Sequence, residues 1–328
     1  GEMFNCTDAT TNANVWKNVG AGITHVHDTS SFQGEIAGFI SSGHGGGAYT
    51  NNIDRFSFIQ DGNATDHGDL AKIRYQASGS SSSTHGYTCG GYGPNPGLSS
   101  SRNEIDRFAF SSSSNATQVG TLSATKRQGA GQSSSTHGYN SGGTAPPPVN
   151  LIEKYSFASS STVANVGTMR IAKASCAGQT SPTHGYNAGG TFVDGVPQPY
   201  NVIDKFPFAS DTNATDVGNL TVSKVGGNGG CSSTTNGYYC GGYLPTPATT
   251  TRIIEKFSFA SNNNASNIAN LLTAQTSVTG TSAVNYGYVC GGGSSNNEIQ
   301  KFTFAADADS TDVGDLVLGM EQGCGQQF

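Results

Sequence analysis

The stretch HGYTCGG at His85–Gly91 returns four more times along the chain in slightly altered form. The later copies are HGYNSGG from His137, HGYNAGG from His184, NGYYCGG from Asn236 and YGYVCGG from Tyr286. Their central glycines recur every 47–52 residues, and a weaker copy, AGFISSG, begins at Ala37. A phrase that returns at a nearly constant spacing indicates a repeated structural unit, which decides the fold.

Three further segments complete each unit, as the first copies show. An alternating segment such as IDRFSF (53–58) places its aromatic residues on one face of a strand. A turn rich in Asn and Thr then leads into a short strand, as in NATDHGDL (63–70). A segment of small residues such as RQGAGQSSST (127–136) precedes the next glycine-tyrosine phrase. Four short strands in about 50 residues are typical of a β-propeller blade.

The two ends of the chain indicate how the ring closes. The last residues, MEQGCGQQF (320–328), match the small-residue strand and then stop, whereas the segment before residue 37 is a poor match. We therefore expect an all-β, six-bladed propeller over 31–328, in which the C-terminal strand completes the first blade and hides its edge. Residues 1–30 are expected to be a linker or the end of a preceding β-module. The alternative is seven blades, with MFNC and VWKNVG as the third and fourth strands of an extra blade that lacks its second strand.

Composition limits the classes of function. The chain has 328 residues, 46 of them glycine, only 12% charged residues and a net charge of -6. It has no cluster of Lys and Arg, so we expect no nucleic-acid partner. It has no apolar run of the roughly 20 residues that span a bilayer, so we expect no membrane insertion. The first residues lack the features of a signal peptide and read as the middle of a longer polypeptide.

Cysteine and histidine occupy replaceable positions of the repeat. Cys89, Cys240 and Cys290 share one position with a serine and an alanine, which predicts a small buried site rather than a metal ligand. The histidines that precede the repeated Gly-Tyr are replaced by Asn and Tyr in later copies, which favours a role in a turn; they are His85, His137 and His184. His25 and His27 could share a metal ion, but no third ligand lies at the usual spacing.

The recurring acidic residues are also interpreted as structural. Asp54, Asp106, Glu153, Asp204 and Glu255 each precede an Arg or Lys. This pattern predicts a solvated strand face with ion pairs of little energetic value. The recurrent Asn of the Asn-Ala-Thr/Ser sequons is expected to serve turn chemistry. The sequence has no GxSxG, phosphate-loop or HExxH motif, so we predict no catalytic residue, metal or cofactor.

The most variable segments connect the second and third strands of the blades. Nine of the eleven prolines lie in four such loops, at 92–104, 144–150, 191–201 and 243–252. Stiff loops on one face of a scaffold are where binding function commonly lies. The candidate binding residues are the loop aromatics Tyr92, Phe192, Tyr200 and Tyr243, which suit sugar or protein surfaces.

Two resemblances follow from these motifs. The double glycine at Gly90–Gly91, followed by the aromatic of the third strand at Phe108, resembles the kelch repeat. The chain departs from that repeat because its only Trp, Trp16, lies outside the blades, and because an arginine before the small-residue strand is patchy, as Arg127 and Arg170. The segment 1–20 and the regular THGYxxGG repeats resemble tail and fibre proteins of tailed bacteriophages, those of marine phages especially.

The second resemblance implies a function that fold alone does not give. It implies a non-enzymatic virion protein of the tail, fibre or nozzle type, which forms a homo-oligomer within a larger assembly of other virion proteins. It also implies a contribution to attachment to a host-surface glycan or protein. Two alternatives remain open: a secreted or cell-surface carbohydrate-active or galactose-oxidase-like propeller enzyme, and a kelch-like adaptor that binds another protein.

Overall fold

The structure is a computed structural model that describes residues 4–8, 15–18, 33–95, 98–145, 147–159, 163–192, 198–226 and 229–328. The chain forms two compact units, Gly1–Ser30 and Ser31–Phe328. In the first unit, β1 (Phe4–Asp8) and β2 (Val15–Asn18) form an antiparallel two-stranded sheet of their own. The described residues contain no helix long and apolar enough to cross a membrane.

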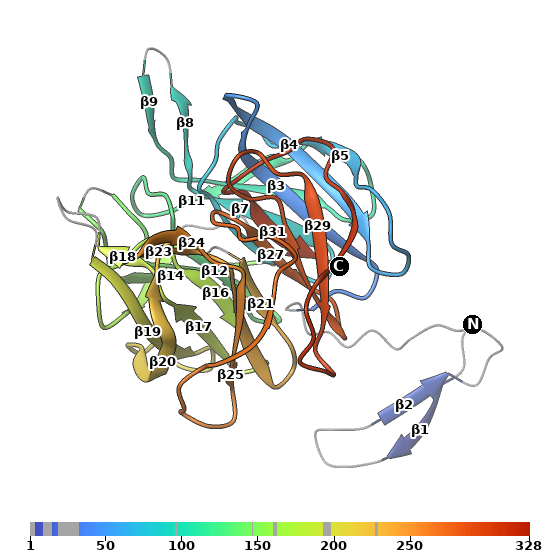
Figure 1. Cartoon of the computed structure of the whole chain (residues 1–328). Helices are drawn as coiled ribbons and strands as arrows, with labels where there is room; N and C mark the ends of the chain where they lie inside the picture. The colour runs from blue at the N-terminus through green and yellow to red at the C-terminus, as the bar shows by residue number, and fades with distance from the viewer. Residues whose placement is uncertain are drawn as a thin grey trace. The chain divides into compact units, whose positions relative to one another are not determined.

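The second unit consists of six four-stranded antiparallel blades (Figure 1). Blade 1 contains β31 (Cys324–Gln327), β3 (Ala37–Gly45), β4 (Ala48–Ser57) and β5 (Thr65–Asp69). Blade 2 contains β6 (Ser78–Ser81), β7 (His85–Cys89), β10 (Glu104–Ala109) and β11 (Thr117–Thr121). Blade 3 contains β12 (Ala130–Ser133), β13 (His137–Ser141), β14 (Leu151–Ser156) and β15 (Ala164–Thr168).

The remaining blades follow the same order from the inside outwards. Blade 4 contains β16 (Ala177–Thr180), β17 (His184–Ala188), β19 (Gln198–Pro207) and β20 (Thr215–Lys224). Blade 5 contains β21 (Gly229–Ser232), β22 (Asn236–Cys240), β25 (Ile253–Ser258) and β26 (Ser266–Asn270). Blade 6 contains β27 (Thr279–Ser282), β28 (Tyr286–Cys290), β29 (Glu298–Thr303) and β30 (Thr311–Asp315). The predicted six-bladed ring is confirmed, and the seven-bladed alternative is wrong because blade 6 packs directly on blade 1, where the rings of Tyr288 and Phe58 stack.

Loops between the second and third strands carry short additional strands. These are the hairpin of β8 (Tyr92–Asn95) and β9 (Leu98–Ser101), the strand β18 (Thr191–Phe192) beside β19, and the hairpin of β23 (Tyr243–Pro245) and β24 (Ala248–Thr250). The β8–β9 hairpin projects from its blade in Figure 1. All of these loops lie on one face of the ring, which we call the loop face.

The ring is closed by pairing the two ends of the second unit. The C-terminal strand β31 lies antiparallel to β3, with Ser41 opposite Cys324 and Gly38 opposite Gln327. The Gln326 side chain donates to the backbone carbonyl of Tyr87 in blade 2 at 3.2 Å. Blade 1 is therefore assembled from segments almost 300 residues apart, as the C-terminal sequence predicts.

The repeated Gly-Tyr phrase has a packing reason. A Cβ atom on Gly86 would lie closer than 3.0 Å to the Phe108 ring on the facing strand, and the equivalent glycine in every other blade meets an aromatic ring in the same way. The next residue, Tyr87, stacks on Phe157 of the following blade with ring centroids 4.8 Å apart. The glycine thus makes room for the third-strand ring, and the tyrosine packs against the next blade.

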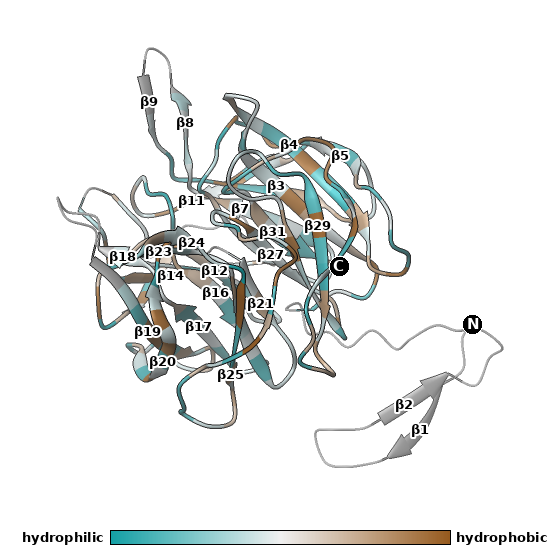
Figure 2. Ribbon diagram, viewed as in Figure 1, coloured by the Kyte–Doolittle hydropathy of each residue, from teal (hydrophilic) through white to brown (hydrophobic). Residues whose placement is uncertain are grey.

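This stack occurs at all six boundaries between blades. The pairs are Phe39–Phe110, Tyr87–Phe157, Tyr139–Phe208, Tyr186–Phe259, Tyr238–Phe304 and Tyr288–Phe58. Each stacked pair stabilises its boundary by about 0.5–1.5 kcal/mol beyond the burial of area. Figure 2 shows apolar segments alternating with polar ones along β4 and β29. This alternation is expected when one face of each strand is buried at a boundary between blades.

The Asn residues of the sequons link blades instead of closing their own turns. Asn115 Oδ1 accepts a hydrogen bond at 3.1 Å from the backbone N–H of Asp69, which lies in the outer strand of the preceding blade. Asn213 accepts in the same way from Thr168 at 3.0 Å. The expectation of a local turn role is therefore wrong, because the outer strand of the neighbouring blade offers a donor within reach.

Candidate functional site

The six innermost strands meet at a ring of glycines, one from each blade. The glycines are Gly79, Gly131, Gly178, Gly230, Gly280 and Gly325. A Cβ atom on any of them would lie closer than 3.0 Å to the carbonyl oxygen of the ring glycine in an adjacent blade. The axis is therefore packed backbone against backbone at this level.

Two cavities of about 60 Å³ each border the glycine ring. One is lined also by Cys176, Thr279 and Cys324, and the other by Ser133, Thr180 and Ser232. The lining residues of both are Gly, Ala, Ser, Thr, Cys and Gln. Cavities of this size have space for a few water molecules but not for a sugar ring. They offer no titratable acid or imidazole toward a ligand.

The repeat histidines belong to turns, as the sequence predicts. His85 Nδ1 lies 2.8 Å from Thr84 Oγ1, and its backbone N–H donates to Ser82 Oγ at 3.0 Å. His137 and His184 repeat both contacts. Burial, followed by the charge of Arg107, lowers the pKa of His85, so its imidazole is neutral at pH 7.

The part of the chain that the structure describes contains no cluster of side chains suited to bind a metal ion. No group of three or more His, Cys, Asp or Glu side chains that could hold an ion occurs there. His25 and His27 lie outside the described residues. The three repeat cysteines are buried free thiols, and burial raises the pKa of Cys89 to about 12. The predicted packing role of this position is confirmed, since a neutral buried thiol behaves as a small apolar group.

The prediction that the recurring acids form a solvated strand face is wrong. The side chains of Asp106 and its equivalents are fully buried, with 0% of the residue exposed, and do not form a solvated face. A β-bulge between Ile105 and Asp106 shifts the register, so two successive residues are both buried and the simple alternation fails. The same bulge follows the equivalent isoleucine in every blade.

Each buried acid in blades 2 to 5 pairs with a cation that shortly precedes the innermost strand of the same blade. The pairs are Arg74–Asp106, Lys126–Glu153, Lys173–Asp204 and Lys224–Glu255. The lysines that directly follow three of these acids bond elsewhere: Lys154, for example, bonds Asp211 of the next blade at 2.6 Å. The buried pairs therefore position loops and strands and are fully used within the scaffold.

One group of side chains on the loop face does not follow the repeat. Tyr49 and Tyr75 stack at 4.5 Å with their planes 9° apart. Tyr92 stands edge-on to Tyr75 at 5.8 Å, and the Arg127 guanidinium lies 4.4 Å above the Tyr92 ring. His44 lies 5.4 Å from Tyr49. We call this group, with Glu321, the aromatic patch.

Paired backbone hydrogen bonds hold the patch residues in place. Tyr75 and Tyr92 exchange N–H···O=C bonds of 2.9 and 2.8 Å, and His44 and Glu321 exchange bonds of 3.0 and 2.9 Å. The side chains of His44 and Glu321 also approach to 3.4 Å and are 30% and 28% exposed. All six patch residues are half-buried, so each keeps part of its surface toward solvent.

Comparison of equivalent positions shows that the patch is specific to blades 1 to 3. The same backbone pairing joins Ala174 to Thr191 in blade 4 and Val225 to Tyr243 in blade 5. In blade 6, Gly293 donates to the carbonyl of Thr276. Apart from Tyr243, which is the counterpart of Tyr92, these positions in blades 4 to 6 hold residues without an aromatic ring or a charge, so the fold does not require the other aromatic and charged side chains of blades 1 to 3.

The structure brings only one predicted site residue into this patch, Tyr92. Tyr200 lies in β19 of blade 4, opposite Lys224, and Tyr243 lies in blade 5. Phe192 lies in β18, and its side chain is outside the described residues. Both Tyr200 and Tyr243 are half-buried.

Tyr49, Tyr75 and Arg127 were missed because they lie outside the proline-rich loops. One sequence feature could have identified Tyr75 and Arg127. Both lie four positions before a glycine of the central ring, where blades 4 to 6 have smaller residues. Comparison with known proteins adds no relative: no protein-family model matches the chain, and no curated protein matches its sequence.

Proposed function

We propose that the chain is a non-catalytic structural and attachment module of a virion appendage, of the tail, fibre or nozzle type, whose aromatic patch contacts a glycan on the host surface. The observation that carries the attachment role is the asymmetry of the patch. Apart from Tyr92, which has a counterpart in Tyr243, its side chains depart from a repeat that is otherwise used for packing, and they do so on three adjacent blades of one face.

The rest of the scaffold supports a passive, rigid role. Aromatic stacks join all six boundaries, the axis is packed by glycine, and the buried acids of blades 2 to 5 are paired with cations. Such a ring presents surface side chains at fixed positions, which reduces the entropy lost on binding. The assignment to a virion appendage rests on the resemblance of the repeats to phage tail and fibre proteins.

Sugar is the ligand class that this chemistry favours. The apolar face of a pyranose packs on aromatic rings, while its hydroxyl groups need charged donors and acceptors around the ring. Tyr75 and Tyr92 supply ring surface, Arg127 supplies donors and Glu321 supplies an acceptor. Burial, and then the neighbouring Tyr49, raises the pKa of Tyr75, so its hydroxyl is protonated at neutral pH and can donate.

We expect Tyr75→Ala and Arg127→Gln each to weaken glycan binding at least tenfold, because each removes a contact near the centre of the patch. Binding of the full chain to a glycan array, followed by calorimetry on the selected sugar, measures this effect. Tyr243→Ala in blade 5 is the matched control and should leave affinity unchanged. Equal affinity of the wild type and both patch variants, or capture of a protein instead of a glycan, would contradict the assignment.

The appendage role is tested separately by gold-labelled antibody against the chain on purified particles. Labelling of tails or fibres is the expected result. Particles that lack the chain would contradict the appendage role while leaving the glycan site standing, so the two parts of the proposal fail independently.

A further inference from the structure

Blade 1 departs from its neighbours at the buried ion pair. In blades 2 to 5 the cation of the ion pair precedes the innermost strand. Its backbone carbonyl accepts a hydrogen bond from the N–H of the last glycine of the repeated phrase in the preceding blade; the Lys126 carbonyl, for example, accepts from Gly91 at 2.9 Å. The carbonyl of Met320 accepts from Gly292 at the same distance. Met320 therefore occupies the cation position of blade 1.

The acid of blade 1 is retained although its cation is missing. Asp54 is 0% exposed. Its Oδ2 accepts from the backbone N–H of Val317 at 2.9 Å, as Asp106 Oδ2 accepts from Ala71 at 3.0 Å. Its Oδ1 is buried and has no hydrogen-bond partner. Asp54 is thus buried and hydrogen-bonded like the paired acids of blades 2 to 5, but the cation that pairs with those acids is replaced by Met320.

Blade 6 shows what a compensated loss looks like. There both members are neutral, with Gln275 at the cation position and Gln300 at the acid position. Gln300 Oε1 accepts from the backbone N–H of Leu272 and from Ser310 Oγ, both at 2.8 Å. A neutral side chain therefore fills the acid position of blade 6 without leaving a buried charge. In blade 1 the same position still holds an acid, Asp54.

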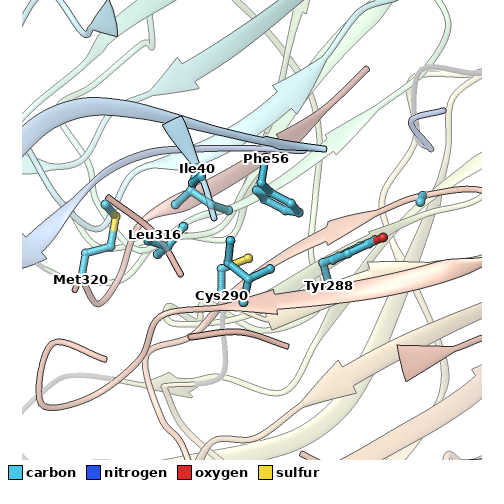
Figure 3. Packing of buried hydrophobic residues seen from close by; sticks show 9 residues of the cluster. Ile40, Phe56, Tyr288, Cys290, Leu316 and Met320 are labelled. Carbon is cyan, nitrogen blue, oxygen red and sulfur yellow. The ribbon is translucent and has the colours of Figure 1, made fainter. Parts of the chain in front are cut away.

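Met320 belongs to the apolar boundary between blades 6 and 1. Ile40, Phe56, Tyr288, Cys290, Leu316 and Met320 pack together there (Figure 3). An ionised carboxylate beside such a cluster loses hydration that backbone N–H groups replace only in part and no cation offsets, so burial of the charge is costly. The cost falls on the blade that joins the two ends of the ring.

We propose that blade 1 is a pH-dependent seam: the ring closes tightly when Asp54 is protonated, and ionisation of Asp54 loosens β31 from β3. The geometry carries this inference, since the single unpaired acid among the five buried acids lies in the one blade formed by chain segments from both ends. The proposal is independent of the glycan site.

The direction of the pH effect follows from the surroundings of Asp54. Burial raises its pKa from 3.8 to about 6, and the charge of Asp66 on β5 adds to this rise, whereas the backbone N–H groups of Val317 and Leu318 oppose it. On the other elements, β3 places Ile40 opposite, the 316–320 connection contributes Met320, and β28 contributes Cys290. Burial raises the pKa of the Cys290 thiol, so that group stays neutral.

The sign is that of a carboxyl group with a raised pKa in the folded state. Its stabilisation is fully present below the unfolded pKa of 3.8 and is lost as pH rises through about 6. From these two pKa values, opening of the seam should become about tenfold more frequent between pH 5 and pH 8.

Amide hydrogen exchange on the full chain, corrected for the intrinsic pH dependence of exchange, tests the proposal. The amides of β31 are compared with those of β12 in blade 3 of the same molecule. In the wild type, protection of β31 relative to β12 should fall about tenfold from pH 5 to pH 8. In Asp54→Asn, which keeps an oxygen for the Val317 N–H, the ratio should be constant.

A second variant keeps the test decisive if Asp54→Asn does not fold. Met320→Lys supplies the cation that blades 3 to 5 carry at this position, and it should likewise abolish the fall in β31 protection. An unchanged ratio in the wild type, or a tenfold fall that persists in the folded variants, would overturn the proposal.

Discussion

Replacement of Gly131 by alanine is expected to lower the free energy of unfolding by about 3 kcal/mol or more. The added Cβ would lie far closer than 3.0 Å to the carbonyl oxygen of Gly79, 2.9 Å from its carbonyl carbon and 3.0 Å from its nitrogen. These are backbone atoms of the neighbouring innermost strand, so no side-chain rotation relieves the clash. The two strands must separate, which disturbs the ring of glycines on both sides. Urea unfolding of the variant and the wild type measures the difference.

Gly293→Ala is the matched control for this substitution. Its new Cβ would lie 3.3 Å from the Thr276 methyl carbon, which a small side-chain adjustment relieves, and in ordinary contact with the Thr276 carbonyl oxygen at 3.8 Å. We expect its stability to lie within about 0.5 kcal/mol of the wild type. If Gly131→Ala were as mild as this control, the close packing of the innermost strands would be wrong.

Loss of a buried cation is the second large effect that we expect. Lys173→Met should destabilise the protein by about 3–5 kcal/mol, because it leaves Asp204 buried without a counter-charge. Lys173 Nζ lies 3.2 Å from Asp204 Oδ2, and both side chains are 0% exposed. Lys173 also donates to the backbone carbonyls of Asn187 and Val202, so the variant loses three interactions. The destabilisation should be smaller at acid pH, where Asp204 can take up a proton.

The double variant Lys173→Gln with Asp204→Asn copies the neutral arrangement of blade 6 and should recover most of this loss. Arg170→Gln, which removes the exposed pair with Asp216, is the control and should cost less than about 1 kcal/mol. A Lys173→Met variant as stable as Arg170→Gln would show that the buried pairs do not hold the blades.

The fold could be predicted from the sequence because the repeated phrases mark where each blade lies along the chain. Gly86 and Tyr87 recur with the aromatic third strand, and both are required by contacts made in every blade. The C-terminal strand could be assigned to blade 1 because its segment QGCGQ (322–326) matches QGAGQ (128–132) of the innermost strand of blade 3. Local pattern and repeat length therefore determine the six-bladed ring.

Features that depend on a shift of register or on the next blade could not be predicted in the same way. The β-bulge beside Ile105 turns Asp106 inward, although alternation places it on the solvated face. Asn115 reaches the outer strand of another blade, which no local turn rule reveals. The aromatic patch arises where Tyr49, Tyr75 and Tyr92 from two blades converge, and only their three-dimensional arrangement brings them together.

Closure of the ring by the C-terminal strand is tested most directly by a single substitution, Ser41→Cys. Ser41 on β3 lies directly opposite the native Cys324 on β31, and Ser41 Oγ lies 3.3 Å from Cys324 Sγ. Directly opposed residues of antiparallel strands are close enough for a disulfide. Mild oxidation of the variant, followed by peptide mass spectrometry, should give a bond between residues 41 and 324 that is absent from the wild type. Failure to form this bond in the folded protein, with Cys324 linked elsewhere or free, would contradict a ring closed through blade 1.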